Sequence, residues 1–152
     1  MRILKSLLAA AAASIISSPV LAGDIMIHDP YARVSSKSAK SGAAFMTIHN
    51  HSSESDVLIS VASTIAKKVE LHTHKEIDGV MKMIKLEDGI IIPSSGHHAL
   101  KRGGDHVMFM GITQSLQHGD EIPVTLIFER SGSLKLTIPV DLERKDKVKH
   151  DH

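Results

Sequence analysis

Residues 72–110 read HTHKEIDGVMKMIKLEDGIIIPSSGHHALKRGGDHVMFM and hold five of the eleven histidines and four of the seven methionines of this 152-residue chain. Met81 alternates with Met83, and in the run HVMFM at 106–110 His and Met alternate with Val and Phe. In a β-strand, residues i and i+2 project from the same face. The alternation therefore predicts strands that aim imidazole and thioether groups at one spot, as a mixed His/Met metal site requires.

Short apolar or alternating runs continue on both sides of this stretch, separated by Gly, Pro, Ser, Asn and Asp. Strands at this spacing are typical of an all-β sandwich or barrel. Only residues 62–69 compete as a helix, and a helix of eight residues is unstable alone. The predicted strands are residues 25–28, 43–50, 57–63, 68–74, 80–86, 89–93, 106–112, 122–130 and 134–140.

The chain is expected to form one domain whose core is aliphatic, because it has no Trp, three Phe and one Tyr. Residues 1–22 have a basic start, an apolar middle and small residues before Gly23, which predicts a secretory signal peptide cleaved after Ala22. The β-domain is expected to span residues 23–142. Residues 143–152, ERKDKVKHDH, have almost no apolar content and are expected to form a flexible tail.

Removal of residues 1–22 takes away two basic residues, which leaves sixteen against seventeen acidic ones and a net charge of about −1. The basic surface that nucleic-acid binding needs is therefore not expected. No membrane anchor is expected either, because the apolar run is short and no cysteine is present to carry a lipid. These features predict a periplasmic protein, which we expect to be a monomer.

The absence of cysteine also limits the chemistry. Disulfides, thiolate zinc sites, iron–sulfur clusters and blue-copper sites all need a cysteine. The serines lie in turn-like contexts and the carboxylates are scattered, so no hydrolytic constellation is predicted and the protein is not expected to be an enzyme.

The central stretch resembles the periplasmic PCu(A)C-type copper chaperones, whose signature is H, ten residues, M, twenty-one residues, then H-x-M. Here ten residues separate His72 from Met83, and His106-Val-Met108 supplies the H-x-M after twenty-two residues, one more than in the signature. The surrounding sequences VELH, DGVMKM and LKRGGDHVMFMGI, and the upstream DPYAR and SGAAFMTIHN, extend the resemblance over most of the mature chain.

The resemblance implies His72, Met83, His106 and Met108 as metal ligands. The extra residue is best placed at 84–88, because a turn absorbs an insertion whereas a slip within a strand would turn every later side chain to the other face. Possible substitutes or accessory ligands share strand parity with these residues or lie in the tail: Met81, Met110, His74, His150 and His152.

The resemblance implies a cupredoxin-like antiparallel β-sandwich or Greek-key barrel that binds Cu(I) and delivers it to copper enzymes. The expected acceptor is the binuclear copper centre of cytochrome c oxidase or another periplasmic copper carrier. Neutral thioethers and imidazoles suit a soft monovalent ion. Additional histidines could hold a second ion as Cu(II), and His97 and His98, on an expected exposed loop, could hold Cu(II) or Zn(II).

Other interpretations remain open. A periplasmic protein that sequesters copper or zinc would use the same ligands. A copper enzyme with an N-terminal histidine brace is disfavoured because cleavage leaves Gly23 first. A dismutase-like site built from His72, His74 and the pair at 97–98 would leave the methionines unused. The remaining histidines, at 28, 49, 51 and 118, are expected to be exposed or hydrogen-bonded.

Overall fold

The computed structural model describes residues 20–145. Most of the predicted signal peptide, and the tail from residue 146 with His150 and His152, lie outside the described residues. Within residues 20–145 every regular element is a strand, and residues 62–69, the weak helix candidate, end one strand and begin the next. No helix long and apolar enough to cross a membrane occurs in this part of the chain.

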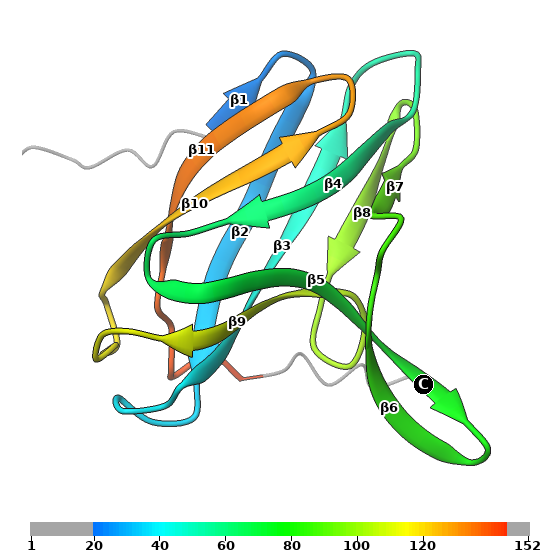
Figure 1. Ribbon diagram of the computed structural model, residues 1–152. Helices are drawn as coiled ribbons and strands as arrows, with labels where there is room; N and C mark the ends of the chain where they lie inside the picture. The colour runs from blue at the N-terminus through cyan, green and yellow to red at the C-terminus, as the bar shows by residue number, and fades with distance from the viewer. Residues whose placement is uncertain (1–19, 146–152) are drawn as a thin grey trace, which may run out of the picture.

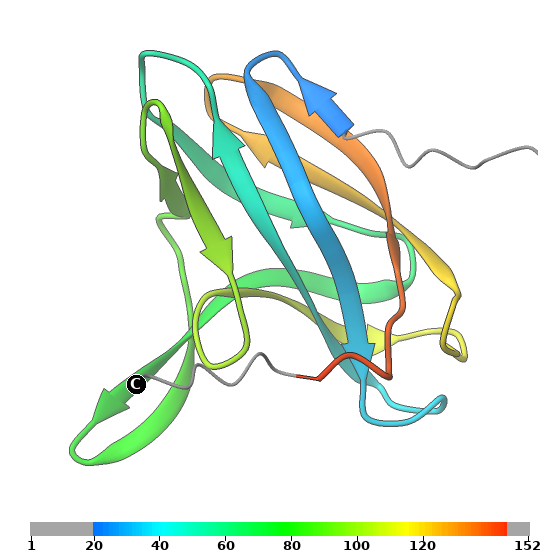
Figure 2. The ribbon, with the colours of Figure 1, turned by 180° about the vertical axis from the view of Figure 1, so that it is seen from behind.

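The strands form two antiparallel sheets that face each other (Figures 1 and 2). The large sheet has the order β1-β2-β3-β9-β5-β6, with β8 also paired to β3, and the small sheet has the order β11-β10-β4-β7. The predicted all-β antiparallel sandwich is confirmed. The strands are β1 (Val20–Ala22), β2 (Ile25–Val34), β3 (Ser41–Asn50), β4 (Asp56–Ala62), β5 (Ala66–Ile77), β6 (Val80–Lys85), β7 (Ile90–Ile92), β8 (Gly96–Leu100), β9 (His106–Ile112), β10 (Glu121–Phe128) and β11 (Gly132–Pro139).

The core between the sheets is aliphatic, as the composition predicts. Alternate residues of β10 and β11 are buried, and Phe109 and Phe128 are the aromatic residues of this core cluster. In β3 the buried residues Ala44, Met46 and Ile48 face this core. The side chains between them therefore project from the opposite, outer face of the large sheet.

Two strands were not predicted. The segment at 96–100, GHHAL, was expected to be an exposed loop but forms β8, which pairs with the second half of β3. This strand is not recognisable from its polar sequence, because two consecutive histidines interrupt the apolar–polar alternation that indicates a half-buried strand. The other strand, β1, falls at the end of the predicted signal peptide and pairs with the start of β2.

Strands β5 and β6 form a long hairpin that projects beyond the sandwich (Figure 1). Its two-residue turn is Asp78-Gly79, and both residues have positive φ, 53° and 77°. An Asp-Gly pair in this conformation matches the right-handed twist of the strands that it joins. The pairing is regular from residue 72 to residue 85, with no register shift at Ile84 or Lys85.

Arg144 is held against β2, although the sequence places it in the tail. Its guanidinium bonds both carboxylate oxygens of Asp29 at 2.7 and 2.9 Å and lies 4.0 Å from the ring centre of Tyr31. A second bond at 3.2 Å joins it to Asp141. Charge and stacking together fix this residue to strand β2.

Candidate metal centre

The register of β5, β6 and β9 brings the predicted ligands to one face of the large sheet. His72 lies opposite His106 in β9, and His74 lies opposite Met83 in β6. Met108 follows His106 by two residues on the same face. This is the outer face, because Val107 and Phe109 point into the core.

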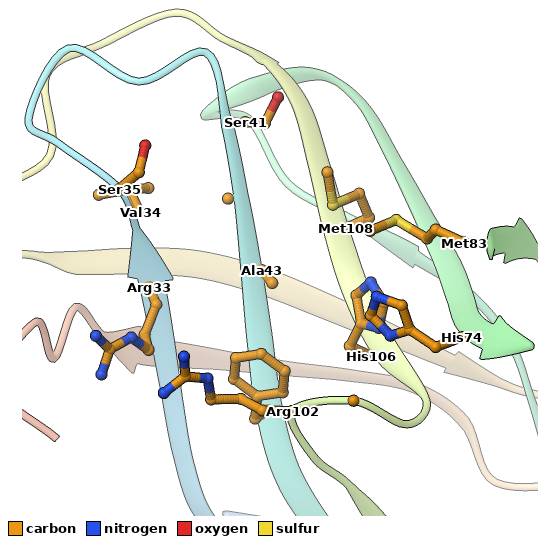
Figure 3. A pocket seen from close by; sticks show the side chains of 13 residues that line it. Arg33, Val34, Ser35, Ser41, Ala43, His74, Met83, Arg102, His106 and Met108 are labelled. Atoms are coloured by element: carbon orange, nitrogen blue, oxygen red, sulfur yellow. The ribbon is translucent and has the colours of Figure 1, made fainter. Parts of the chain in front are cut away.

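A pocket of about 430 Å³ opens on this face. Figure 3 shows the side chains of Met83 and Met108 next to each other, and below them the rings of His74 and His106. Three of the four predicted ligands, Met83, His106 and Met108, therefore line one pocket. His72 does not line it, whereas His74, a predicted substitute, does. The pocket is lined by Arg33, Val34, Ser35, Ser41, Gly42, Ala43, Phe45, His74, Met83, Arg102, Gly103, His106 and Met108.

His106 is buried and held in one tautomer. Its Nδ1 donates to the Gly104 carbonyl at 2.9 Å, so its Nε2 keeps a free lone pair. Gly104 belongs to a tight turn in which Gly103 has a positive φ of 79°. Burial lowers the pKa of His106 from its ordinary 6.5, as do the nearby His74 and His72, against the opposing effect of the Gly104 carbonyl. The ring is therefore neutral at pH 7, as metal binding requires.

His72 lies beside the pocket and is held by Glu70. Its Nε2 is 2.8 Å from the Glu70 carboxylate, and its Nδ1 is buried without a hydrogen-bond partner. The bonds from His72 and from Lys68 lower the pKa of Glu70 to about 2. A carboxylate that accepts from one imidazole nitrogen leaves the other free for a metal, which is a common arrangement around metal-binding histidines.

His74 presents a second unpaired nitrogen. Its Nδ1 is buried and lacks a partner, and its ring stacks on His106 with the centres 5.2 Å apart. A buried polar atom without a partner costs about 1–3 kcal/mol. These are the two unpaired buried side-chain N or O atoms found among the described residues, and both lie within this group of histidines. A metal ion bound here would supply the missing partner, so the residues fit such an ion.

The methionines of the hairpin are not core residues. Met83 is 45% exposed and Met81 is 60% exposed. Water-exposed thioethers gain little from burial, so packing does not explain them. No group of three or more His, Cys, Asp or Glu side chains within residues 23–145 is close enough, as the side chains stand, to hold a metal. Met83 and Met108 line the pocket beside the imidazoles, so their sulfurs are available as ligands.

Two predicted substitutes lie outside the pocket lining. Met81 pairs with Glu76 nearer the hairpin tip, and Met110 pairs with Lys68 and Ser41 further along β9. Both have the predicted strand parity, but neither contributes to the cavity. His98, considered as an accessory ligand, is bonded to Asp105 at 2.8 Å.

A comparison with known protein families shows which family the chain belongs to. Residues 25–140 match the family described as "Putative lipoprotein LpqE-like". The chain belongs to the LpqE-like family. Its relatives include a putative lipoprotein of Leifsonia xyli, 32% identical over 106 residues, and an uncharacterised protein of Rickettsia prowazekii, 28% identical over 119 residues. The matches cover 68% and 74% of this chain, but only 64% and 65% of the length of these relatives.

Solved structures confirm the cupredoxin-like fold of this LpqE-like chain and its resemblance to PCu(A)C proteins. The copper-bound PCuAC domain from PmoF2 superimposes with a TM-score of 0.68 at 24% identity, over 82% of this chain and 98% of that domain. Apo-DR1885 from Deinococcus radiodurans gives 0.61 at 25% identity, over 93% and 95% of the two chains. CuI-DR1885 gives 0.59 at 28% identity, over 78% and 80%.

Several residues around the pocket of this LpqE-like protein were not predicted. Phe45 of β3 packs near His106, with ring centres 6.3 Å apart, and Arg33 and Arg102 line the pocket. Arg33 and Phe45 are far from the His/Met stretch in sequence, and only the β2-β3-β9 pairing brings them to it, whereas Arg102 lies within the stretch, four residues before His106. Glu70 precedes His72 by two residues, so their shared strand parity was a signal that could have identified it.

Proposed function

We propose that this protein binds one Cu(I) ion through His72, Met83, His106 and Met108 and delivers it to copper enzymes. The observation that carries the proposal is the pocket in which two thioethers meet the imidazoles of His74 and His106. The Nδ1 atoms of His74 and of the neighbouring His72 are buried without partners. His74 is the alternative to His72, because it lines the pocket in the structure as it stands.

The ligand chemistry supports Cu(I). Thioether sulfur is a soft ligand that selects Cu(I), whereas Zn(II) and Cu(II) prefer imidazole and oxygen. All four proposed ligands are neutral, so the bound site carries only the single charge of the ion and avoids a large desolvation cost. The ionised Glu70 carboxylate, which is hydrogen-bonded to His72, offsets part of that charge. The related DR1885 is itself described in a Cu(I) form.

The position of the site supports a carrier. Met83 is on an exposed hairpin at the edge of the sheet, where an incoming protein could replace it as a ligand. A partly open site with one movable ligand releases its ion more readily than a closed one. We propose that the protein acts outside the cytoplasm, in the periplasm, without catalytic activity. The acceptor that we propose is the copper domain of cytochrome c oxidase or another copper carrier.

A transfer assay tests this function against storage. The Cu(I)-loaded protein is mixed without oxygen with the apo copper domain of a cytochrome c oxidase, and the two are then separated and assayed for copper. We expect most of the copper on the acceptor, at a rate that rises with acceptor concentration because an encounter complex forms. Transfer whose rate equals that of spontaneous copper release, whatever the acceptor concentration, would instead identify a sequestration protein.

A further inference from the structure

Four histidines lie together on the outer face of the large sheet, away from the His/Met pocket. The ring centre of His49 is 4.4 Å from that of His28, 5.2 Å from that of His97 and 6.2 Å from that of His51. We propose that this histidine cluster is a second metal site, which takes a divalent ion, Cu(II) or Zn(II), through imidazole nitrogens.

The backbone explains why these rings meet. His49 of β3 lies directly opposite His97 of β8, and opposite Met26 of β2 on its other side. His28 follows Met26 by two residues and is the diagonal neighbour of His49 on the same face. His51 follows the end of β3. Three neighbouring segments therefore supply the imidazoles from a rigid sheet, which is a favourable base for a binding site.

The separations between the rings fit a shared ion. A metal–nitrogen bond of about 2.1 Å places two imidazole centres roughly 4.5–5.2 Å apart when the bonds make a square-planar or tetrahedral angle. The distances from His49 to His28 and to His97 are close to these limits. His49 therefore already lies at the spacing that a shared ion needs from His28 and from His97.

Binding requires the rings to turn. His49 and His97 are stacked with an interplanar angle of 25°, whereas an ion lies in the plane of each ring that binds it. This stacking is consistent with the absence of a preformed His/Cys/Asp/Glu group within the described residues. His28, His51 and His97 are exposed, so rotation about their side-chain bonds meets little resistance.

The ligand type decides which ion the cluster selects, because all four side chains are imidazoles. Neutral imidazoles without sulfur favour Cu(II) and Zn(II) over Cu(I), so the histidine cluster and the His/Met pocket differ in the ion that they select.

The two sites share one face of β3 but are separate. Phe45, Thr47 and His49 alternate along this face, with Phe45 at the pocket and His49 in the cluster. Four residues of strand span about 13 Å. A variant of the histidine cluster can therefore be tested without touching the pocket.

The test is a Zn(II) titration against a chromophoric chelator, repeated with Cu(II) and monitored by electron paramagnetic resonance. The parent is the full chain with His150→Ala and His152→Ala, so that the tail histidines cannot bind. We expect one divalent ion to bind the parent and its affinity to fall at least about tenfold in His49→Gln and in His97→Gln, because each change removes a ligand. The matched control is His118→Gln, which changes an exposed histidine beside Asp141 and Glu143.

Equal affinity of the parent, His49→Gln and His97→Gln would overturn the site, as would a parent that binds no divalent ion. If His49→Gln does not fold, the exposed His28→Gln and His97→Gln variants decide in its place. Cu(I) affinity is measured in the same variants and should stay unchanged. Its loss would show that the two groups of histidines act as one site.

Discussion

Replacing both Met83 and Met108 by Leu should abolish high-affinity Cu(I) binding while the protein stays folded. Leu keeps the approximate volume and apolar character of Met, so the free energy of unfolding should change by less than about 1.5 kcal/mol. The change at Met83 should lower the free energy of unfolding less than the change at Met108, because the Met83 side chain is 45% exposed. Loss of a residue that only hydrogen-bonds a metal ligand lowers metal affinity about 10- to 100-fold. Loss of two ligands that touch the metal should therefore lower it by more. Competition with a Cu(I) chelator measures the effect.

The matched control for this prediction is Met81→Leu. Met81 is on the same strand and the same face as Met83, two residues away, but it is outside the pocket. It should retain the affinity of the parent. If Met81→Leu weakens binding and Met83→Leu does not, then Met81 is the ligand and the placement of the extra residue at 84–88 is wrong. Unchanged affinity in the double variant would remove the proposed site.

His72→Gln should weaken Cu(I) binding about 10- to 100-fold, and more than His74→Gln. His72 is paired with His106 on the β5–β9 ladder, and Glu70 fixes its Nε2 so that Nδ1 is free. His74 lies beyond the last β5–β9 pair and is paired only with β6. The more rigid residue loses less conformational entropy on binding. Both variants are compared by the same chelator competition.

Glu70→Gln distinguishes the two histidines independently. The neutral amide accepts a weaker hydrogen bond than the carboxylate, so Cu(I) affinity should fall if His72 is a ligand and stay unchanged if His74 is. A large loss in His74→Gln with little change in His72→Gln would mean that the present pocket lining is the ligand set.

The sequence predicted most strands because their side chains alternate between core and solvent, as in 106–112 and 134–140. It missed the extension of β2 to Val34, because Pro30 suggests an end. In fact the ladder shifts register between His28 and Tyr31, and a bulge absorbs the proline. The polar strand β8 carried no apolar alternation and could not be recognised in the same way.

For the candidate site, strand parity predicted which side chains share a face but not how far apart they lie along it. His72 and His74 have the same parity, so sequence alone could not choose between them. The sequence suggested His97 for a second ion but not the histidines beside it. His28 and His49 are far from His97 in the sequence, and only the pairing of β2, β3 and β8 brings their rings together.

The most direct test of a mixed His/Met centre is X-ray absorption spectroscopy at the copper edge on the protein loaded with one equivalent of Cu(I). We predict an edge typical of Cu(I) and scattering from two sulfur and two imidazole nitrogen atoms, with the sulfur contribution lost in the Met83→Leu, Met108→Leu variant. A spectrum of the parent that contains nitrogen and oxygen scattering but no sulfur would contradict the proposed centre.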